Sequence, residues 1–243
     1  DRLRSRGLGD VYKRQLLIII FIVAGFVYKG HELYKQALEK ISISDKVAEI
    51  KSDENYTKLE DMSEFYKDAV IAVEDRRFYE HGAIDPIALA RAIYSNIKAK
   101  ELREGGSTIT QQLAKNIYFT QEKSALRKIA EIFMAYDLEK NLNKDTILEL
   151  YLNTSYFGDG YYCVAEASRG YYKKEPKDMN RNEASMLAGI PNAPSAYCPT
   201  KHLDLAKKRQ NQVLDKMVRY EFITAKEKEE ILNESNAVED NKD

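Results

Sequence analysis

The sequence predicts a mainly α-helical protein. Helix-start signals recur along the chain, including capping boxes at Asn180 with Glu183 and Thr224 with Glu227. Apolar residues recur at helical spacing, whereas sustained strand alternation is absent from the sequence. A hydrophobic content of 44% in 243 residues supports a real core, in one domain of moderate size with a short extra segment.

The first segment, residues 1–15, is basic and has no apolar period. Its cations are Arg2, Arg4, Arg6, Lys13 and Arg14. We interpret it as either a cytoplasmic flank or foreign sequence, and leave it out of the fold argument.

Residues 16–29 are predicted to form a membrane anchor. The apolar run of residues 16–28 is shorter than the roughly 20 residues that a spanning helix needs, but Lys13, Arg14 and Lys29 can snorkel to the interfaces. The basic flank precedes the run, which predicts that the rest of the chain lies outside the cytoplasm. We favour an uncleaved single anchor over a cleaved signal or a buried core helix.

The helical body is expected to follow a stalk or connecting helix at residues 30–57. Asp61 with Glu64 predicts a helix that reaches Glu74, and Asp85-Pro86 predicts the start of the next. That second helix carries an apolar face of Ile87, Ala90, Ile93, Tyr94 and Ile97.

Later helix starts are also predicted from local signals. Ser107 is expected to cap a helix that runs through Lys115. The longest predicted helix is residues 125–141, and Asn143 is expected to cap the helix that follows it. Loops are predicted at 100–106, 156–161 and 190–202. The body spans residues 58–222, and residues 223–243 form a C-terminal helix and polar tail.

Two glutamates are candidates for chemistry. Glu74 ends an apolar run and lies among acids, arginines, aromatic rings and a histidine, an environment that can tune a carboxyl group for proton transfer. Glu131 lies on a helix that is apolar on nearly all sides, so its carboxylate needs a partner or a function. Arg127 lies one turn earlier and could pair with it, so a structural ion pair and a functional acid both remain open.

The composition excludes some functions. A net charge of −1 argues against nucleic acid as a partner. Cys163 and Cys198 lack metal-ligand spacing, and we favour two isolated thiols over a bridge. Ser95 and Lys98 fit the Ser-x-x-Lys of transpeptidases by chance, since the sequence has no Lys-Thr-Gly.

Five sequence blocks follow one another along the chain: Glu74-Asp75 with Phe78 and His81, Gly-Gly-Ser-Thr-Ile-Thr-Gln-Gln at 105–112, Arg127-Lys128 with Glu131, residues 149–158, and residues 183–199. Together they resemble the peptidoglycan glycosyltransferases, a lysozyme-like family that polymerises lipid II. This family, glycosyltransferase family 51, includes the transglycosylase domains of class A penicillin-binding proteins and monofunctional enzymes. One departure is Ala83, where the family usually has Gly.

The resemblance implies a lysozyme-like glycosyltransferase domain behind a single N-terminal membrane anchor. Glu74 would be the general base, and Glu131 would assist at the donor diphosphate, directly or through a divalent cation. The implied substrate-binding residues are Asp75, Phe78, His81, Arg91, Gly106, Ser107, Thr108, Gln111, Gln112, Lys115, Asn116, Lys123, Arg127 and Lys128.

The same resemblance implies partners and a location. The substrates would be lipid II and the lipid-linked glycan strand, at a bacterial cell membrane that the chain crosses once, with the catalytic domain outside the cytoplasm. No cofactor would be obligatory, although Mg²⁺ or Mn²⁺ could take part. Transpeptidases and other cell-wall synthesis proteins are candidate partners. A lysozyme-like muramidase or lytic transglycosylase and an inactive wall-binding scaffold are the alternative functions.

Overall fold

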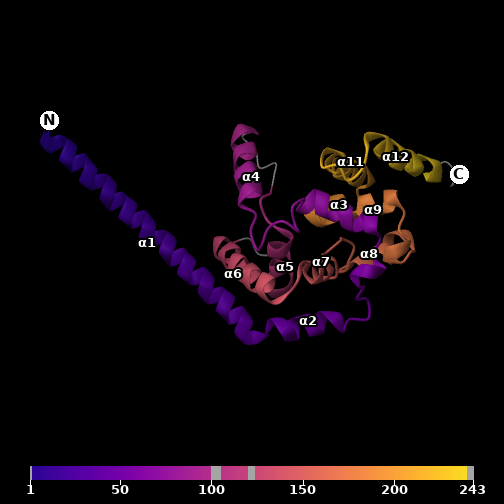
Figure 1. The fold of residues 1–243 in the computed structure, drawn as a ribbon, viewed down its shortest axis with the longest axis horizontal. Coiled ribbons are helices and arrows are strands. Elements are labelled where there is room, and N and C mark those ends of the chain that lie inside the picture. Colours follow the sequence, from indigo (N-terminus) through magenta and orange to yellow (C-terminus); the bar gives the residue numbers. More distant parts are fainter. Residues whose placement is uncertain (1, 100–104, 120–123, 240–243) are drawn as a thin grey trace.

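The chain folds into a helical body from which one long helix projects (Figure 1). This computed structural model describes residues 2–99, 105–119 and 124–239, and over those residues it contains helices and no strand, which confirms the mainly α prediction. The elements, with 3₁₀ helices marked η, are α1 (Arg2–Lys40), α2 (Ile43–Lys51), η1 (Leu59–Asp61), α3 (Glu64–Glu74), α4 (Pro86–Ala99), α5 (Ile109–Tyr118), α6 (Ala125–Asn141), α7 (Lys144–Leu152), α8 (Val164–Tyr172), η2 (Pro176–Asp178), α9 (Arg181–Gly189), η3 (Ile190–Asn192), α10 (Pro194–Tyr197), α11 (Leu203–Arg219) and α12 (Ala225–Glu239).

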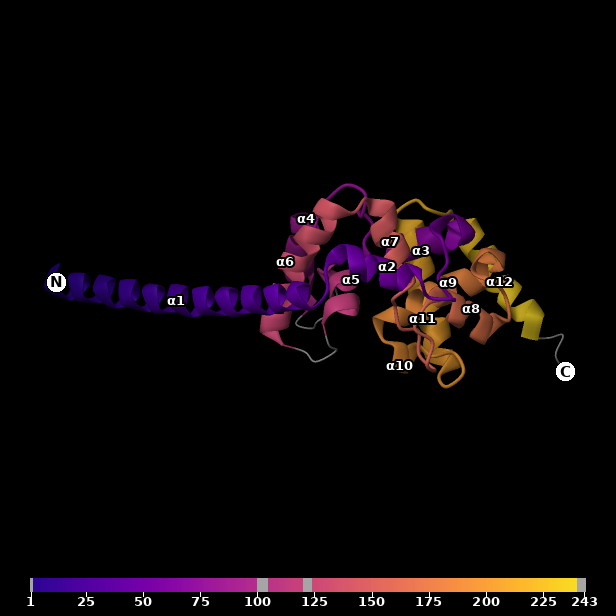
Figure 2. The same ribbon diagram turned by 90° about the horizontal axis from the view of Figure 1, so that it is seen from below.

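Helix α1 is continuous through the anchor and connecting segments that the sequence separates at residues 29 and 30. It has 39 residues, about 58 Å at the usual rise per residue. Within the described residues it is the one helix long and apolar enough to cross a membrane, over Val11–Lys40. Figure 2 shows its N-terminal part extending well away from the body. The apolar side chains of residues 16–23 on this part are more than half exposed.

The C-terminal part of α1 packs along α6. Gly30 makes the close approach possible, because a Cβ there would lie 2.5 Å from Cγ2 of Ile129. One turn on, the Tyr34 hydroxyl donates a hydrogen bond to the carboxylate of Asp137, and the Tyr34 ring lies 5.8 Å from that of Phe133. The projecting helix is therefore joined to the body by tight packing.

The linker after α2 is held by α7. Glu149 accepts hydrogen bonds from the Tyr56 hydroxyl and, at 2.7 Å, from the backbone N–H of Leu59. Asn153 accepts a hydrogen bond of 2.8 Å from the backbone N–H of Thr57. These contacts fix the path by which the chain enters the body.

Two groups of helices share one core. Helix α3 packs against α9 and α11, and α5 packs against α6 and α7. Fully buried side chains such as Tyr66 on α3, Ile109 on α5 and Met134 on α6 belong to the same cluster. The ends of α3, α5 and α6 are therefore brought to one side of the body, where the candidate site lies.

Most predicted helix starts are confirmed. Asp85, Asn143, Asn180 and Thr224 accept hydrogen bonds from the first turns of their helices. The predicted helix at residues 125–141 matches α6.

Two helix starts were predicted wrongly. Helix α3 starts after Ser63, because Asp61 belongs to η1. Helix α5 is capped by Thr108 in place of Ser107, because Thr108 and Gln111 form the capping box. The predicted loop at residues 190–202 contains the short helices η3 and α10. Cys163 and Cys198 are buried free thiols, as expected.

The packing of α1 on α6 yields a stability prediction. Gly30→Ala should lower the free energy of unfolding by about 1–3 kcal/mol, the usual cost of forcing extra atoms into a packed contact. Gly25→Ala is the matched control, because a Cβ there meets nothing within 4 Å while the helix-propensity gain is the same. Thermal unfolding of both variants in detergent measures the difference, and equal melting temperatures would contradict close packing at Gly30.

Candidate active site

A cleft of about 840 Å³ runs between the end of α3, the N-terminal ends of α5 and α6, and α11. Its lining combines acidic, basic and amide side chains with the backbone of residues 105–107. Glu74 and Glu131 both line it, so the structure brings the two predicted acids to one opening.

Glu74 is the last residue of α3, and its side chain is only 10% exposed. Gln112 on α5 donates a hydrogen bond of 2.8 Å from Nε2 to Oε2 of Glu74. Nη2 of Arg209, on α11, lies 3.8 Å from the other oxygen, Oε1. Among the described residues no group donates a hydrogen bond to Oε1, so one oxygen of this carboxylate is oriented and the other has acceptor capacity to spare.

Glu131 lies in the first half of α6, and its side chain is 2% exposed. Nε of Arg127 lies 2.8 Å from its Oε1, and Nζ of Lys128 lies 3.0 Å from its Oε2. The ion pair with Arg127 that the sequence suggested is therefore present. A buried carboxylate held by two cations keeps those cations at fixed positions beside the cleft.

Lys115 lies on α5 and lines the same cleft. Burial lowers the pKa of Lys115 below its usual value, the charge of Glu131 opposes that change, and Arg127 and Lys128 add to it. The three cations are thus close enough to repel one another, and an anionic ligand between them would relieve that repulsion.

The turn before α5 completes this part of the cleft. A Cβ on Gly106 would lie 3.0 Å from Cδ1 of Leu89, so the backbone passes close to α4. Ser107 accepts a hydrogen bond of 2.9 Å from Nζ of Lys128. This turn and the cations of α6 therefore form one surface suited to an anion, as the Gly-Gly-Ser pattern predicts.

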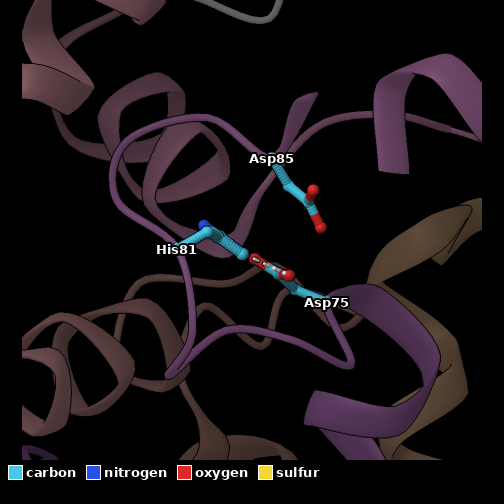
Figure 3. A group of neighbouring side chains, drawn as sticks. All are labelled: Asp75, His81 and Asp85. Atoms are coloured by element: carbon cyan, nitrogen blue, oxygen red, sulfur yellow. Dashed lines mark hydrogen bonds and ion pairs between the residues drawn. The ribbon is translucent and has the colours of Figure 1, made fainter. Parts of the chain in front are cut away.

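Asp75 contacts both His81 and the start of α5, and Figure 3 shows the contact with His81. Its Oδ1 lies 2.7 Å from Nε2 of His81, and its Oδ2 accepts a hydrogen bond of 3.0 Å from the backbone N–H of Ile109. Asp85, drawn beside them, pairs with Arg77 and caps α4.

The acids that could hold a metal ion already have other partners. Asp75, His81 and Asp85 offer ligand atoms within 4.8 Å of one another, and the two carboxylates also pair with Arg77 and backbone N–H groups. At Glu131, Arg127 and Lys128 lie beside the two oxygens, so a divalent cation there would share the carboxylate with them.

Several predicted substrate-binding residues have other tasks. Phe78 is fully buried in the core, with Nζ of Lys144 4.5 Å from its ring centre, and it does not line the cleft. His81 and Asn116 do not line the cleft. Thr108 and Gln111 border it, but their polar atoms form the capping box of α5, so they shape the loop.

The remaining predicted residues mostly stay at the cleft. Those that line it are Asp75, Arg91, Gly106, Ser107, Gln112, Lys115, Arg127 and Lys128. Lys123 lies outside the described residues.

One wall of the cleft, formed by α11, was not predicted from the sequence. Arg209, Gln212, Lys216 and Arg219 all line it, at spacings of three and four residues that place them on one helix face. That spacing was readable from the sequence, but charged helix faces are usually solvated, and only the fold shows that this one faces Glu74. Tyr220 lies at the end of the same wall.

Comparison with known proteins identifies the family of the chain. A family model described as "Transglycosylase" matches residues 43–218. Relatives include "Penicillin-binding protein 1A" of Neisseria lactamica, 42% identical over 84% of this chain and 26% of the relative, and "Penicillin-binding protein 1F" of Bacillus subtilis (strain 168), 40% identical over 89% of this chain and 33% of the relative. The chain thus spans about a quarter to a third of the length of these curated relatives.

The solved structures include penicillin-binding protein 1A from Haemophilus influenzae, which matches with a TM-score of 0.44 at 23% identity over 73% of this chain and 17% of that chain. From the family match and the identity to the curated relatives, the chain belongs to the transglycosylase family.

The pair of His81 and Asp75 predicts a pH-dependent stability. Burial lowers the pKa of His81, but the hydrogen bond and charge of Asp75, together with the backbone hydrogen bond to Gly82, outweigh burial and Lys144, so the pKa is raised from 6.5. A raised pKa in the folded state means stability that is full below about 6.5 and is lost as the pH rises through the raised value. The free energy of unfolding, measured by urea titration across this range, should fall with pH.

The control compares two histidine variants. His81→Gln should remove this fall, whereas His202→Gln, at an exposed position, should keep it. A wild-type protein whose stability rises over the same range would contradict the pairing.

Proposed function

We propose that this chain is a peptidoglycan glycosyltransferase that polymerises lipid II into glycan strands. The observation that carries the proposal is the placement of Glu74 and Glu131 at one cleft with different surroundings. The cation nearest Oε1 of Glu74 is Arg209, at 3.8 Å, whereas the two oxygens of Glu131 lie 2.8 Å and 3.0 Å from Arg127 and Lys128. One acid is suited to take a proton, and the other to organise positive charge.

The base step follows from Glu74. Its carboxylate takes the proton of the 4-hydroxyl of the acceptor sugar as that oxygen attacks the anomeric carbon of the donor strand. A new bond forms between that carbon and the acceptor oxygen, the bond from the carbon to the lipid diphosphate breaks, and the configuration inverts. The electron pair of the broken bond leaves with undecaprenyl diphosphate, so a base is needed on one face and charge stabilisation on the other.

The donor side supplies that stabilisation. Diphosphate leaves with about two negative charges, and fixed cations lower the barrier because they need no rearrangement as charge develops. Lys115, Arg127 and Lys128 are held beside the cleft for this task, and Glu131 keeps the last two in position. The step as proposed uses these three cations and does not pass through a divalent metal ion.

The acceptor is also lipid-linked and also carries a diphosphate. The cationic face of α11, with Arg209, Lys216 and Arg219, lies on the Glu74 side of the cleft and is where we place it. Two cationic walls then serve two anionic substrates, and the reacting sugars meet between them.

A lipid substrate requires that the cleft stand at a membrane surface. We propose that α1 anchors the chain in a bacterial cell membrane with a single pass, and that the body lies outside the cytoplasm. Helix α4 supports a second contact, because its predicted apolar face is turned outward: Ile87, Ile93, Tyr94 and Ile97 are more than half exposed. Transpeptidases and other cell-wall synthesis proteins are the proposed partners, since new strands have to be cross-linked.

Mutation of the base tests the reaction. Glu74→Gln keeps the shape of the side chain and removes its basicity, so polymerisation of lipid II should fall at least about 100-fold, the low end for loss of a general base. Glu80→Gln, in the same sequence cluster but with an exposed side chain, should keep full activity. Equal melting temperatures control for folding, and full activity in Glu74→Gln would remove Glu74 from this role.

The outward face of α4 allows a test of membrane contact. The chain has no tryptophan, so Ile97→Trp adds a single reporter at a side chain that is 72% exposed. In vesicles containing brominated lipid, fluorescence of this variant should be quenched. Lys226→Trp on α12 is the control, and equal quenching in both variants would contradict contact through α4.

A further inference from the structure

One matched sequence block, residues 149–158, has no role in the steps above. Its first residues form the end of α7. Glu149 in this helix and Asn153 directly after it hold the incoming linker. Tyr151 lies between them and points into the body, with its side chain 1% exposed. A tyrosine in such a position usually serves only to fill the core. A further role for Tyr151 therefore depends on what its hydroxyl contacts.

The Tyr151 hydroxyl has a specific partner. It donates a hydrogen bond of 3.2 Å to Oε1 of Gln112, and Nε2 of the same amide donates the bond of 2.8 Å to Glu74. Burial, and next the charge of Glu74, raise the pKa of Tyr151 well above its ordinary value, so the hydroxyl keeps its proton and stays a donor.

The order of these bonds is fixed by chemistry. An ionised carboxylate accepts hydrogen bonds only, so the Gln112 amide has to turn its N–H₂ toward Glu74. In that orientation the amide oxygen points at Tyr151, whose hydroxyl donates a hydrogen bond to it. Without the hydroxyl, Oε1 would lose this donor, and the amide would be freer to rotate away from the carboxylate.

Other buried tyrosines lack this arrangement. Tyr66 on α3 is also fully buried, yet its hydroxyl has no hydrogen-bond partner among the described residues. Burial on its own therefore does not account for the contact that Tyr151 makes.

We propose that Tyr151 is a positioning residue for the general base: through the amide of Gln112 it holds Glu74 with one oxygen directed for proton transfer. The inference rests on the proposed function, because it gives Glu74 that role. It adds a third residue, on a different helix, to the group that prepares the base. Tyr151 itself touches no reacting atom.

The test is a double-mutant cycle in the full chain, with lipid II as the substrate. Tyr151→Phe should lower kcat about tenfold, the factor that corresponds to roughly 1.4 kcal/mol, with KM unchanged. Gln112→Ala should lower kcat at least as far. In the Gln112→Ala background, Tyr151→Phe should change kcat less than about twofold, because the connection it acts through is already gone.

Tyr66→Phe is the matched control, since it removes a hydroxyl of equal burial that is outside the connection; it should keep wild-type kcat. A tenfold loss from Tyr151→Phe in both backgrounds would assign the residue a general packing role and overturn the proposal. Wild-type kcat in Tyr151→Phe would overturn it as well, while leaving the function in place. Absence of polymerisation by the wild-type chain would overturn the proposed function, and this inference with it.

Discussion

The carboxylate of Asp75 is the contact on which the arrangement of the site depends. One of its oxygens meets His81, and the other accepts a hydrogen bond from the first residue of α5. The end of α3 is thereby tied to the start of α5. Glu74 precedes Asp75 directly and Gln112 lies one turn into α5, so the same connection brings the proposed base to its amide partner. A buried, fully paired carboxylate suits this task because each bond it loses costs more than an exposed one.

Charge in the cleft is arranged so that each acid has a different environment. Glu131 is surrounded by cations on its own helix, and its cost of burial is offset by two close pairs. Glu74 faces an amide at 2.8 Å and an arginine at 3.8 Å, a weaker set of partners. The difference between the two surroundings therefore separates the two proposed roles.

Local patterns predicted the helices well, because caps and apolar spacing act within a few residues. Asn143, Asn180 and the bounds of α6 followed from such signals. Contacts between distant segments were not readable in this way: nothing near Phe78 indicates that its ring is fully buried, and nothing near Arg209 indicates that it faces Glu74. Thr108 replaced Ser107 as the cap because the partner three residues on, Gln111, decides the start. The resemblance identified the two acids, but their distinct partners are a property of the fold.

The position of α6 links the proposed membrane anchor to the proposed reaction. Ile129 and Phe133 face α1, whereas Glu131, two positions from each, faces the cleft, because such a step turns about 200° around a helix. Helix α1 is continuous from its apolar part to this contact and is joined there through Gly30 and Tyr34. A rigid connection of this kind would fix the height of Glu131 and its cations above the bilayer. The diphosphate of a membrane lipid also lies at a fixed height, at the level of the headgroups, so a cleft held in this way would meet its substrate without a further search along the membrane normal.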